Sequence, residues 1–186
     1  MINFRKSGKI VLGLTGGISS GKSTAAAAFK KAGARVICAD TLSAKYFGLK
    51  IEEIQKYFGT CGRPQIAAQV FTDGKKRKWL EELLHPLISK EAKKIIKTAK
   101  ERVIVFDVPL LFEAGLQNSF DLVLCIYASF EIRQKRTSFT RADFKRRDAA
   151  QMPLEDKAAA ADIVIHSETA KKDLEAKVIK FCKAIK

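Results

Sequence analysis

The sequence predicts an α/β fold of three layers, in which helices cover both faces of a parallel, mostly five-stranded sheet. Short apolar segments recur along the chain, helical segments separate them, and a glycine-rich turn directly follows the first one. The segments are apolar at both of their alternating positions, as the strands of a covered parallel sheet are. The expected strands are Ile10–Leu14, Arg35–Cys38, Val103–Asp107, Leu122–Tyr127 and Ile163–Ile165.

The helical segments between these strands indicate how the chain is organised. The whole chain, residues 1–186, is expected to form a single domain. Helix content between residues 41 and 101 exceeds what one crossover between strands needs, which predicts an inserted helical subdomain there. The expected helices are Ser23–Lys31, Thr41–Phe58, Gln65–Phe71, Lys75–Glu101 with an interruption near Pro86, Phe130–Gln151, and Ala170–Lys186 with a buried stripe of Leu174, Val178, Phe181 and Ile185.

The turn after the first strand has the Walker A spacing Gly-x4-Gly-Lys-Ser. Its glycines allow successive backbone N–H groups to point into one concavity at a helix N-terminus. The lysine can reach the β- and γ-phosphates, and the serine hydroxyl can bind Mg²⁺. Strand, loop and helix follow in the order that a P-loop NTPase fold requires, so we expect a bound nucleoside triphosphate. The loop reads Gly16, Gly17, Ile18, Ser19, Ser20, Gly21, Lys22, Ser23 and Thr24.

Composition narrows the class of protein. The chain is 47% hydrophobic and 30% charged, as in soluble globular proteins, and no apolar run approaches the length of a membrane span. Its 4 cysteines are widely spaced, which favours a reducing cytoplasm. The net charge of +15 favours an anionic partner, either a nucleic acid or a polyphosphate substrate. Charge alone does not decide between them.

Two aspartates follow predicted strands at the sheet edge where ligands of open α/β sheets bind. Asp40 could accept a proton from an attacking hydroxyl or help to position Mg²⁺. It could equally cap the helix that begins at Thr41. Asp107 resembles a Walker B carboxylate that binds Mg²⁺, although a strand-end aspartate can instead be held by neighbouring backbone groups.

The region of residues 130–157 is a candidate lid. Arginines there could close over the triphosphate and neutralise charge during phosphoryl transfer. A solvated basic helix would have the same composition. His85 has no second ligand at metal-binding spacing, so we expect no zinc site. The candidate lid arginines are Arg133, Arg136, Arg141, Arg146 and Arg147.

Several separate segments resemble the successive motifs of one family, the dephospho-CoA kinases. The order and approximate spacing hold from residue 10 to about residue 180, and the His-Pro and Pro-Leu-Leu-Phe-Glu segments are the most specific. Gln134 and Arg136 resemble the motif that opens the lid, and Arg147, Gln151 and Lys157 the segment that closes it. The other matching segments are Leu14–Ile18, Ala39-Asp40, Leu84–Ile88, Val108–Glu113 and Ala161–Ile165.

This resemblance implies transfer of the ATP γ-phosphoryl group to the ribose 3′-hydroxyl of dephospho-CoA, the last step of coenzyme A synthesis. It implies ATP and Mg²⁺ in the site, a helical substrate-binding subdomain and a lid. Asp40 matches the catalytic aspartate of the family, with Lys22 and Arg136 as further catalytic residues and Ser23 and Asp107 as metal ligands. Substrate contacts are expected from Asp40, His85, Pro109, Leu110 and Arg141.

The chain departs from the family at three places. Cys38 stands where the family usually has a first aspartate before Ala39-Asp40, which removes one carboxylate near the metal. The lid between Arg136 and Gln151 is a few residues short. His166-Ser167 replaces a common Asp-Asn after the last strand, on the adenine side of the site.

Alternative functions remain open from the sequence alone. A nucleoside or nucleotide kinase would share the same phosphate-binding core. A nucleotide-gated module could instead use the basic surface to bind nucleic acid, although no aromatic-interleaved basic patch supports this. We therefore expect small-molecule substrates without a nucleic acid or membrane partner, in a cytoplasmic monomer or weak homo-oligomer.

Overall fold

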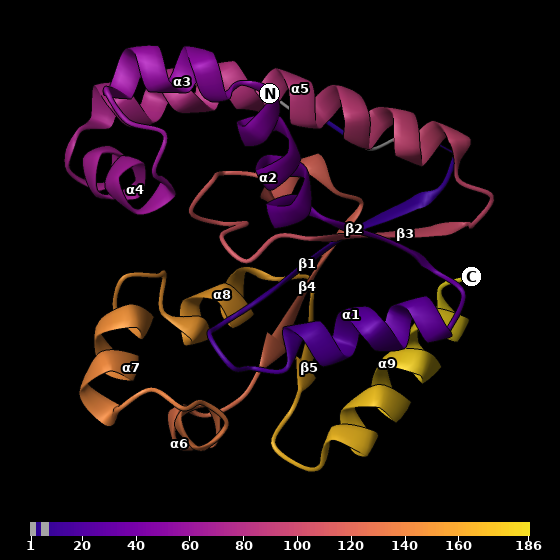
Figure 1. The fold of residues 1–186 in the computed structure, drawn as a ribbon. Coiled ribbons are helices and arrows are strands. Elements are labelled where there is room, and N and C mark those ends of the chain that lie inside the picture. The colour runs from indigo at the N-terminus through magenta and orange to yellow at the C-terminus, as the bar shows by residue number, and fades with distance from the viewer. Residues whose placement is uncertain (1–2, 5–7) are drawn as a thin grey trace. The chain divides into compact units, whose positions relative to one another are not determined.

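The computed structural model describes residues 3–4 and 8–186 (Figure 1). Its centre is a five-stranded sheet of order β2-β3-β1-β4-β5. Strand β1 pairs in parallel with β3 and with β4, and β4 pairs in parallel with β5. The predicted fold class is confirmed. The strands are β1 (Ile10–Gly16), β2 (Arg35–Cys38), β3 (Val103–Asp107), β4 (Leu122–Tyr127) and β5 (Ile163–His166).

Helices cover both faces of the sheet. Helices α1 (Lys22–Lys31) and α9 (Lys171–Ala184) lie side by side (Figure 1) and bury Phe29, Leu174 and Val178 in one core with alternate residues of the strands. Helix α8 (Leu154–Ala160) packs against β1 and β4 on the other face. Because side chains alternate along a strand, neighbouring residues of β4 enter different layers.

The chain divides into two compact units, residues 1–37 with 96–186, and residues 38–95. The second unit is helical. Its core contains Phe47, Ile54, Phe58, Ile66 and Leu84, and the rings of Tyr57 and Trp79 stack at 4.0 Å. Its helices are α2 (Ala39–Leu49), α3 (Ile51–Phe58), α4 (Arg63–Thr72) and the larger part of α5 (Gly74–Thr98).

Three helix predictions are wrong in detail. The helix expected over Thr41–Phe58 breaks at Lys50 (φ −109°), which ends α2 and precedes α3. The interruption expected near Pro86 does not occur, because α5 continues through the proline while its apolar side chains pack into the helical core. The helix expected over Phe130–Gln151 is two helices, α6 (Phe130–Lys135) and α7 (Arg141–Asp148).

The break before α7 and the helix after it have recognisable local causes. Thr140 caps α7 by accepting a hydrogen bond from the backbone N–H of Asp143. Pro153 is the N-cap of α8, and the negative charges of Glu155 and Asp156 in the first turn favour the positive N-terminal end of the helix. Both signals are local features of the sequence. In α9 the fully buried residue of the last turns is Cys182, whereas Phe181 and Ile185 are partly buried.

Two further findings concern cysteines and membranes. All 4 cysteines are free, and Cys125 and Cys182 are buried. In the described part of the chain, no helix has the length and apolar character needed to cross a bilayer. A short 3₁₀ helix, η1 (Gln117–Ser119), precedes β4.

Candidate active site

The loop between β1 and α1 has a backbone that only certain residues can adopt. Gly16 and Gly21 have φ angles of +155° and +103°, and Ser19 adopts the left-handed value of +59°. A Cβ at Gly16 would lie 2.7 Å from the Ile126 carbonyl oxygen. A Cβ at Gly21 would lie 2.8 Å from the Leu174 side chain. Glycine is therefore required at both positions for steric and conformational reasons.

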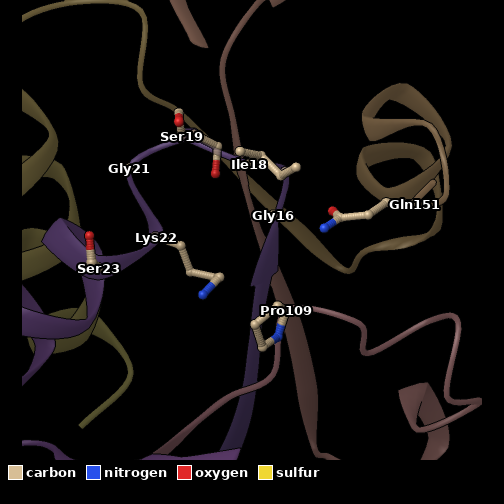
Figure 2. A pocket seen from close by; sticks show the side chains of 10 residues that line it. Gly16, Ile18, Ser19, Gly21, Lys22, Ser23, Pro109 and Gln151 are labelled. Carbon is tan, nitrogen blue, oxygen red and sulfur yellow. The ribbon is translucent and has the colours of Figure 1, made fainter. Parts of the chain in front are cut away.

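This loop forms the wall of a pocket of about 230 Å³ (Figure 2). The central strand delivers the chain to the carboxyl edge of the sheet, and α1 begins at Lys22. A helix N-terminus at the rim of a concave loop provides backbone donors for an anion. The lining residues are Gly16, Gly17, Ile18, Ser19, Ser20, Gly21, Lys22, Ser23, Pro109 and Gln151.

Lys22 and Asp107 form an ion pair at this edge of the sheet. Lys22 Nζ lies 2.8 Å from Asp107 Oδ1, and both side chains are less than one-fifth exposed. Their proximity follows from the sheet, because β3 pairs with β1 in a register that places Asp107 opposite Leu14. The structure thus brings the predicted Walker A lysine and Walker B aspartate together.

Arg136 lies beside the phosphate loop and binds the segment that follows β5. Its guanidinium donates hydrogen bonds to the backbone oxygens of Ser167 (2.8 Å) and Thr169 (3.1 Å). It also donates to the Ser167 hydroxyl at 3.0 Å. The same hydroxyl lies next to Gly21, so Ser167 connects Arg136 with the start of α1. From the sequence, Ser167 was predicted only as a departure from the family pattern.

Arg133 has a different environment from the one expected of a lid arginine. Its side chain is 2% exposed and makes a two-pronged ion pair with Asp148. Its Nε donates to the Ala128 carbonyl, and its guanidinium lies over the rings of Phe130 and Phe144. Arg133 is therefore a buried cation that joins α6 to α7, neither a free lid arginine nor a solvated one.

The three remaining candidate arginines have their own partners on the lid segment. Arg141 lies over the Phe130 ring at 5.5 Å, and Arg147 over the Phe139 ring at 4.4 Å. Arg146 forms an exposed ion pair with Asp143. None of the three lines the pocket at the phosphate loop.

Asp40 and His85 belong to the unit of residues 38–95, whereas the phosphate loop belongs to the other unit. Asp40 is exposed in the first turn of α2. The helix begins at Ala39 with Cys38 as its N-cap, so Asp40 does not cap it. His85 is an exposed residue within α5.

Two predicted substrate residues follow β3. Pro109 lines the pocket, and Leu110 beside it is 47% exposed. Two further polar groups at the site were not predicted as site residues. Gln151 lines the pocket, and its Oε1 is buried without a hydrogen-bond partner in the described residues. Lys157 is fully buried nearby. The sequence carries no periodic signal for either, because each depends on contacts far along the chain.

The donor set at the pocket fits a magnesium ion that is shared with a phosphate ligand. The Ser23 hydroxyl lines the pocket, and the Asp107 carboxylate lies next to it through the ion pair with Lys22, so both supply hard oxygen donors. Mg²⁺ is usually bound by one or two carboxylates plus substrate phosphates, so a dedicated protein cage is unnecessary. Within the described residues no group of three or more His, Cys, Asp or Glu side chains forms such a cage.

Comparison with known proteins identifies the family of this chain. The family model described as dephospho-CoA kinase matches residues 10–173. A dephospho-CoA kinase from Lactobacillus johnsonii is 36% identical over 90% of this chain and 93% of its own length. One from Bartonella quintana is 35% identical over 89% of this chain and 91% of its own. A crystal structure from Thermus thermophilus has a TM-score of 0.87, 30% identity, and coverage of 96% of this chain and 98% of that one. The chain belongs to the dephospho-CoA kinase family.

Proposed function

We propose that this chain transfers the γ-phosphoryl group of ATP to the ribose 3′-hydroxyl of dephospho-CoA, which yields coenzyme A and ADP. The observation that carries the proposal is the glycine-rich loop, with its pocket at the carboxyl end of β1, in a chain that matches the family over residues 10–173. Reactions of this kind depend mainly on alignment and on stabilisation of charge.

The loop and the start of α1 would hold the triphosphate. Backbone N–H groups of residues 16–24 and the Lys22 ammonium would face an anion bound in the pocket. Arg136 is held beside the loop by Ser167, a position from which its positive charge would stabilise the transferring phosphoryl group. Lys22 and Arg136 therefore act on the donor side of the reaction.

Ser23 and Asp107 would hold Mg²⁺. The ion, when bound, supplies positive charge that neutralises the phosphate oxygens during transfer. Asp107 also forms the ion pair with Lys22, which keeps the ammonium at the edge of the pocket. Cys38 supplies no carboxylate at the position where the family usually has one, two residues before Asp40, so we assign the carboxylate of the metal site to Asp107.

Asp40 would act on the acceptor side. Its exposed carboxylate can accept the proton of the 3′-hydroxyl as the oxygen attacks phosphorus. His85, Pro109, Leu110 and Arg141 would contact the dephospho-CoA molecule. These contacts are expected to determine KM for dephospho-CoA, whereas Asp40 contributes mainly to kcat.

We also propose that the reaction takes place in the cytoplasm, by a monomer or weak homo-oligomer. The four free cysteines support a reducing compartment. Small-molecule substrates account for the phosphate pocket without a nucleic acid or membrane partner.

The first test is a substrate panel. Purified protein with Mg²⁺ and ATP should phosphorylate dephospho-CoA, and nucleosides and nucleoside monophosphates should be poor acceptors. Preferential phosphorylation of a nucleoside or nucleotide would favour the alternative kinase function. The product should carry its new phosphate on the 3′-oxygen, which phosphorus NMR distinguishes.

The second test concerns Asp40. Asp40→Asn should lower kcat by about 10²- to 10⁴-fold, the usual contribution of general base catalysis, while ATP affinity changes little. Asp173→Asn is the matched control, since Asp173 is also an exposed aspartate in the first turn of a helix. Full activity of Asp40→Asn would remove Asp40 from the mechanism.

A further inference from the structure

Lys157 is a fully buried cation whose partners all lie near the phosphate pocket. Its side chain, on α8, has 0% exposure, and its Nζ lies 2.8 Å from Glu113 Oε1. The same Nζ donates a hydrogen bond to the Pro109 carbonyl at 3.1 Å. A buried ion pair is often no more stabilising than apolar residues of similar volume, so stability alone does not explain why the chain has one here. The position of the pair next to the pocket suggests a role in arranging the pocket wall.

The pair holds two pocket-lining residues that do not belong to the phosphate loop. Pro109 is held directly, through its carbonyl oxygen, which also accepts a hydrogen bond from the buried Thr15 hydroxyl at 3.1 Å. Gln151 is held through the next residue, because Glu113 Oε1 accepts a hydrogen bond from the Met152 backbone N–H at 3.0 Å. Figure 2 shows Pro109 and Gln151 on the pocket wall that faces the loop.

The Gln151 carboxamide is the polar group that this arrangement positions. Its Oε1 is buried and has no hydrogen-bond partner in the described part of the chain, although buried polar atoms are nearly always paired. Oε1 is an acceptor, whereas Nε2 offers two donors, and phosphate oxygens are acceptors. In Figure 2 the amide end of Gln151 points toward the loop. Phosphate oxygens would accept hydrogen bonds from Nε2, whereas the unpartnered Oε1 needs a donor, which a hydroxyl group of a nucleotide can provide.

We propose that Gln151 contacts the phosphate-bearing nucleotide and that the Glu113–Lys157 ion pair is the positioning device that holds Gln151 in place. The proposal rests on the proposed function for the identity of the ligand as ATP. It assigns a binding role to Gln151 and a positioning role to Glu113 and Lys157, which touch no substrate themselves. The kinetic effects of these residues should therefore depend on one another.

The test is a double-mutant cycle. Gln151→Leu keeps the approximate volume and removes both amide groups, and should raise KM for ATP by about 10- to 100-fold, the range expected when a positioned contact is lost. The pair is removed by Lys157→Met with Glu113→Gln, which leaves no unpaired buried charge and keeps an acceptor for Met152. This variant should raise KM for ATP similarly. Combining all three changes should add less than about twofold to either loss.

A matched control separates positioning from general damage to the unit. Lys31 and Glu175 form a Lys–Glu pair at 2.9 Å between α1 and α9, more exposed than the buried pair. Lys31→Met with Glu175→Gln should leave KM for ATP unchanged. If the variant with Lys157→Met does not fold, the cycle is run with Lys157→Gln and Glu113→Gln, which keeps polar side chains at both positions, an acceptor for Met152 and no unpaired buried charge.

Nucleotide binding is measured alongside turnover, by titration calorimetry with ADP and ATP. This readout does not need the acceptor, so it distinguishes failure of this proposal from failure of the proposed function. Unchanged affinity in Gln151→Leu would overturn the role of Gln151. Losses that multiply independently across the cycle would overturn the positioning role of the pair.

Discussion

At the scale of single residues, the site divides into parts that the sequence predicts and parts that it does not. The phosphate loop is predictable because its requirements are local, namely positive φ at Gly16 and Gly21 and a lysine at the start of a helix. Lys157 and its acceptor Pro109 are 48 positions apart. No spacing in the sequence indicates such a contact, and a lysine within a helix is usually solvated. Burial of that lysine is decided by the packing of α8 against β1 and β4.

Cys125 provides a test at this scale. It lies in the interior of β4, and burial raises the pKa of its thiol from 9.0 to about 11, with Lys157 opposing the shift. Between pH 9 and 11 the unfolded chain loses the thiol proton while the folded chain retains it. The free energy of unfolding should therefore fall as pH rises through this window, by up to about 1.4 kcal/mol per pH unit from this group.

The measurement is urea unfolding of the wild type and of Cys125→Ala at several pH values between 8 and 11. Other groups titrate in both proteins, so the difference between the two isolates Cys125. That difference should be constant below pH 9 and should shrink above it. A constant offset for Cys125→Ala across this range would contradict the raised pKa.

At the scale of elements, strands were predicted more accurately than helices for a physical reason. The three central strands β1, β3 and β4 are buried along most of their length, so each is a largely apolar run in the sequence. Helix ends depend on capping, and the break before α7 is set by one threonine side chain. A basic composition continues through that break, so composition gives no indication of it.

Pro86 in α5 gives the test at this scale. The proline has no backbone N–H and its ring crowds the preceding turn, yet the helix continues from Gly74 to Thr98. Pro86→Ala should restore a helical hydrogen bond and stabilise α5 by about 1–3 kcal/mol. Thermal unfolding followed by circular dichroism should show a higher midpoint. A similar change at an exposed non-proline position, Lys90→Ala, should have little effect.

Pro86→Ala also tests whether the proline contributes to substrate binding. Residues that break a local structural rule are often retained for a functional reason. Because His85 adjoins the proline, Pro86→Ala should raise KM for dephospho-CoA while KM for ATP stays constant. A lower unfolding midpoint would mean that α5 is shaped by the proline in a way that alanine cannot reproduce.

At the scale of the whole molecule, the strand order explains why distant segments meet at the pocket. With β1 central, the segments that follow β3 and β4 lie on its two sides, and the segment after β5 lies beyond β4. Pro109, Arg133 and Ser167 therefore reach the same loop from three places in the sequence. The five strands were predictable one by one, but their order depends on pairing between distant residues and was not.

The net charge of +15 is a property of the whole molecule, and it predicts that kcat/KM depends on ionic strength. ATP and dephospho-CoA are both anions, so an excess of positive charge should accelerate their encounter with the protein. Salt screens this attraction, since the Debye length falls from about 10 Å at 0.1 M to about 3 Å at 1 M. Raising the ionic strength over this range should lower kcat/KM by roughly tenfold. The value of kcat at saturating substrate should change much less, because the contacts inside the pocket are less exposed to solvent.

The measurement is initial rates at several concentrations of NaCl, repeated with KCl to separate ionic strength from effects of a particular cation. Binding of a DNA duplex is followed in parallel, since a nucleic-acid-binding protein would show tight, steeply salt-dependent affinity for it. We expect salt-dependent turnover with weak DNA binding. If kcat/KM is insensitive to salt, the excess charge lies on helix faces away from the path of the substrates. The attraction that matters would then be confined to Lys22, Arg136 and the backbone donors of the phosphate loop.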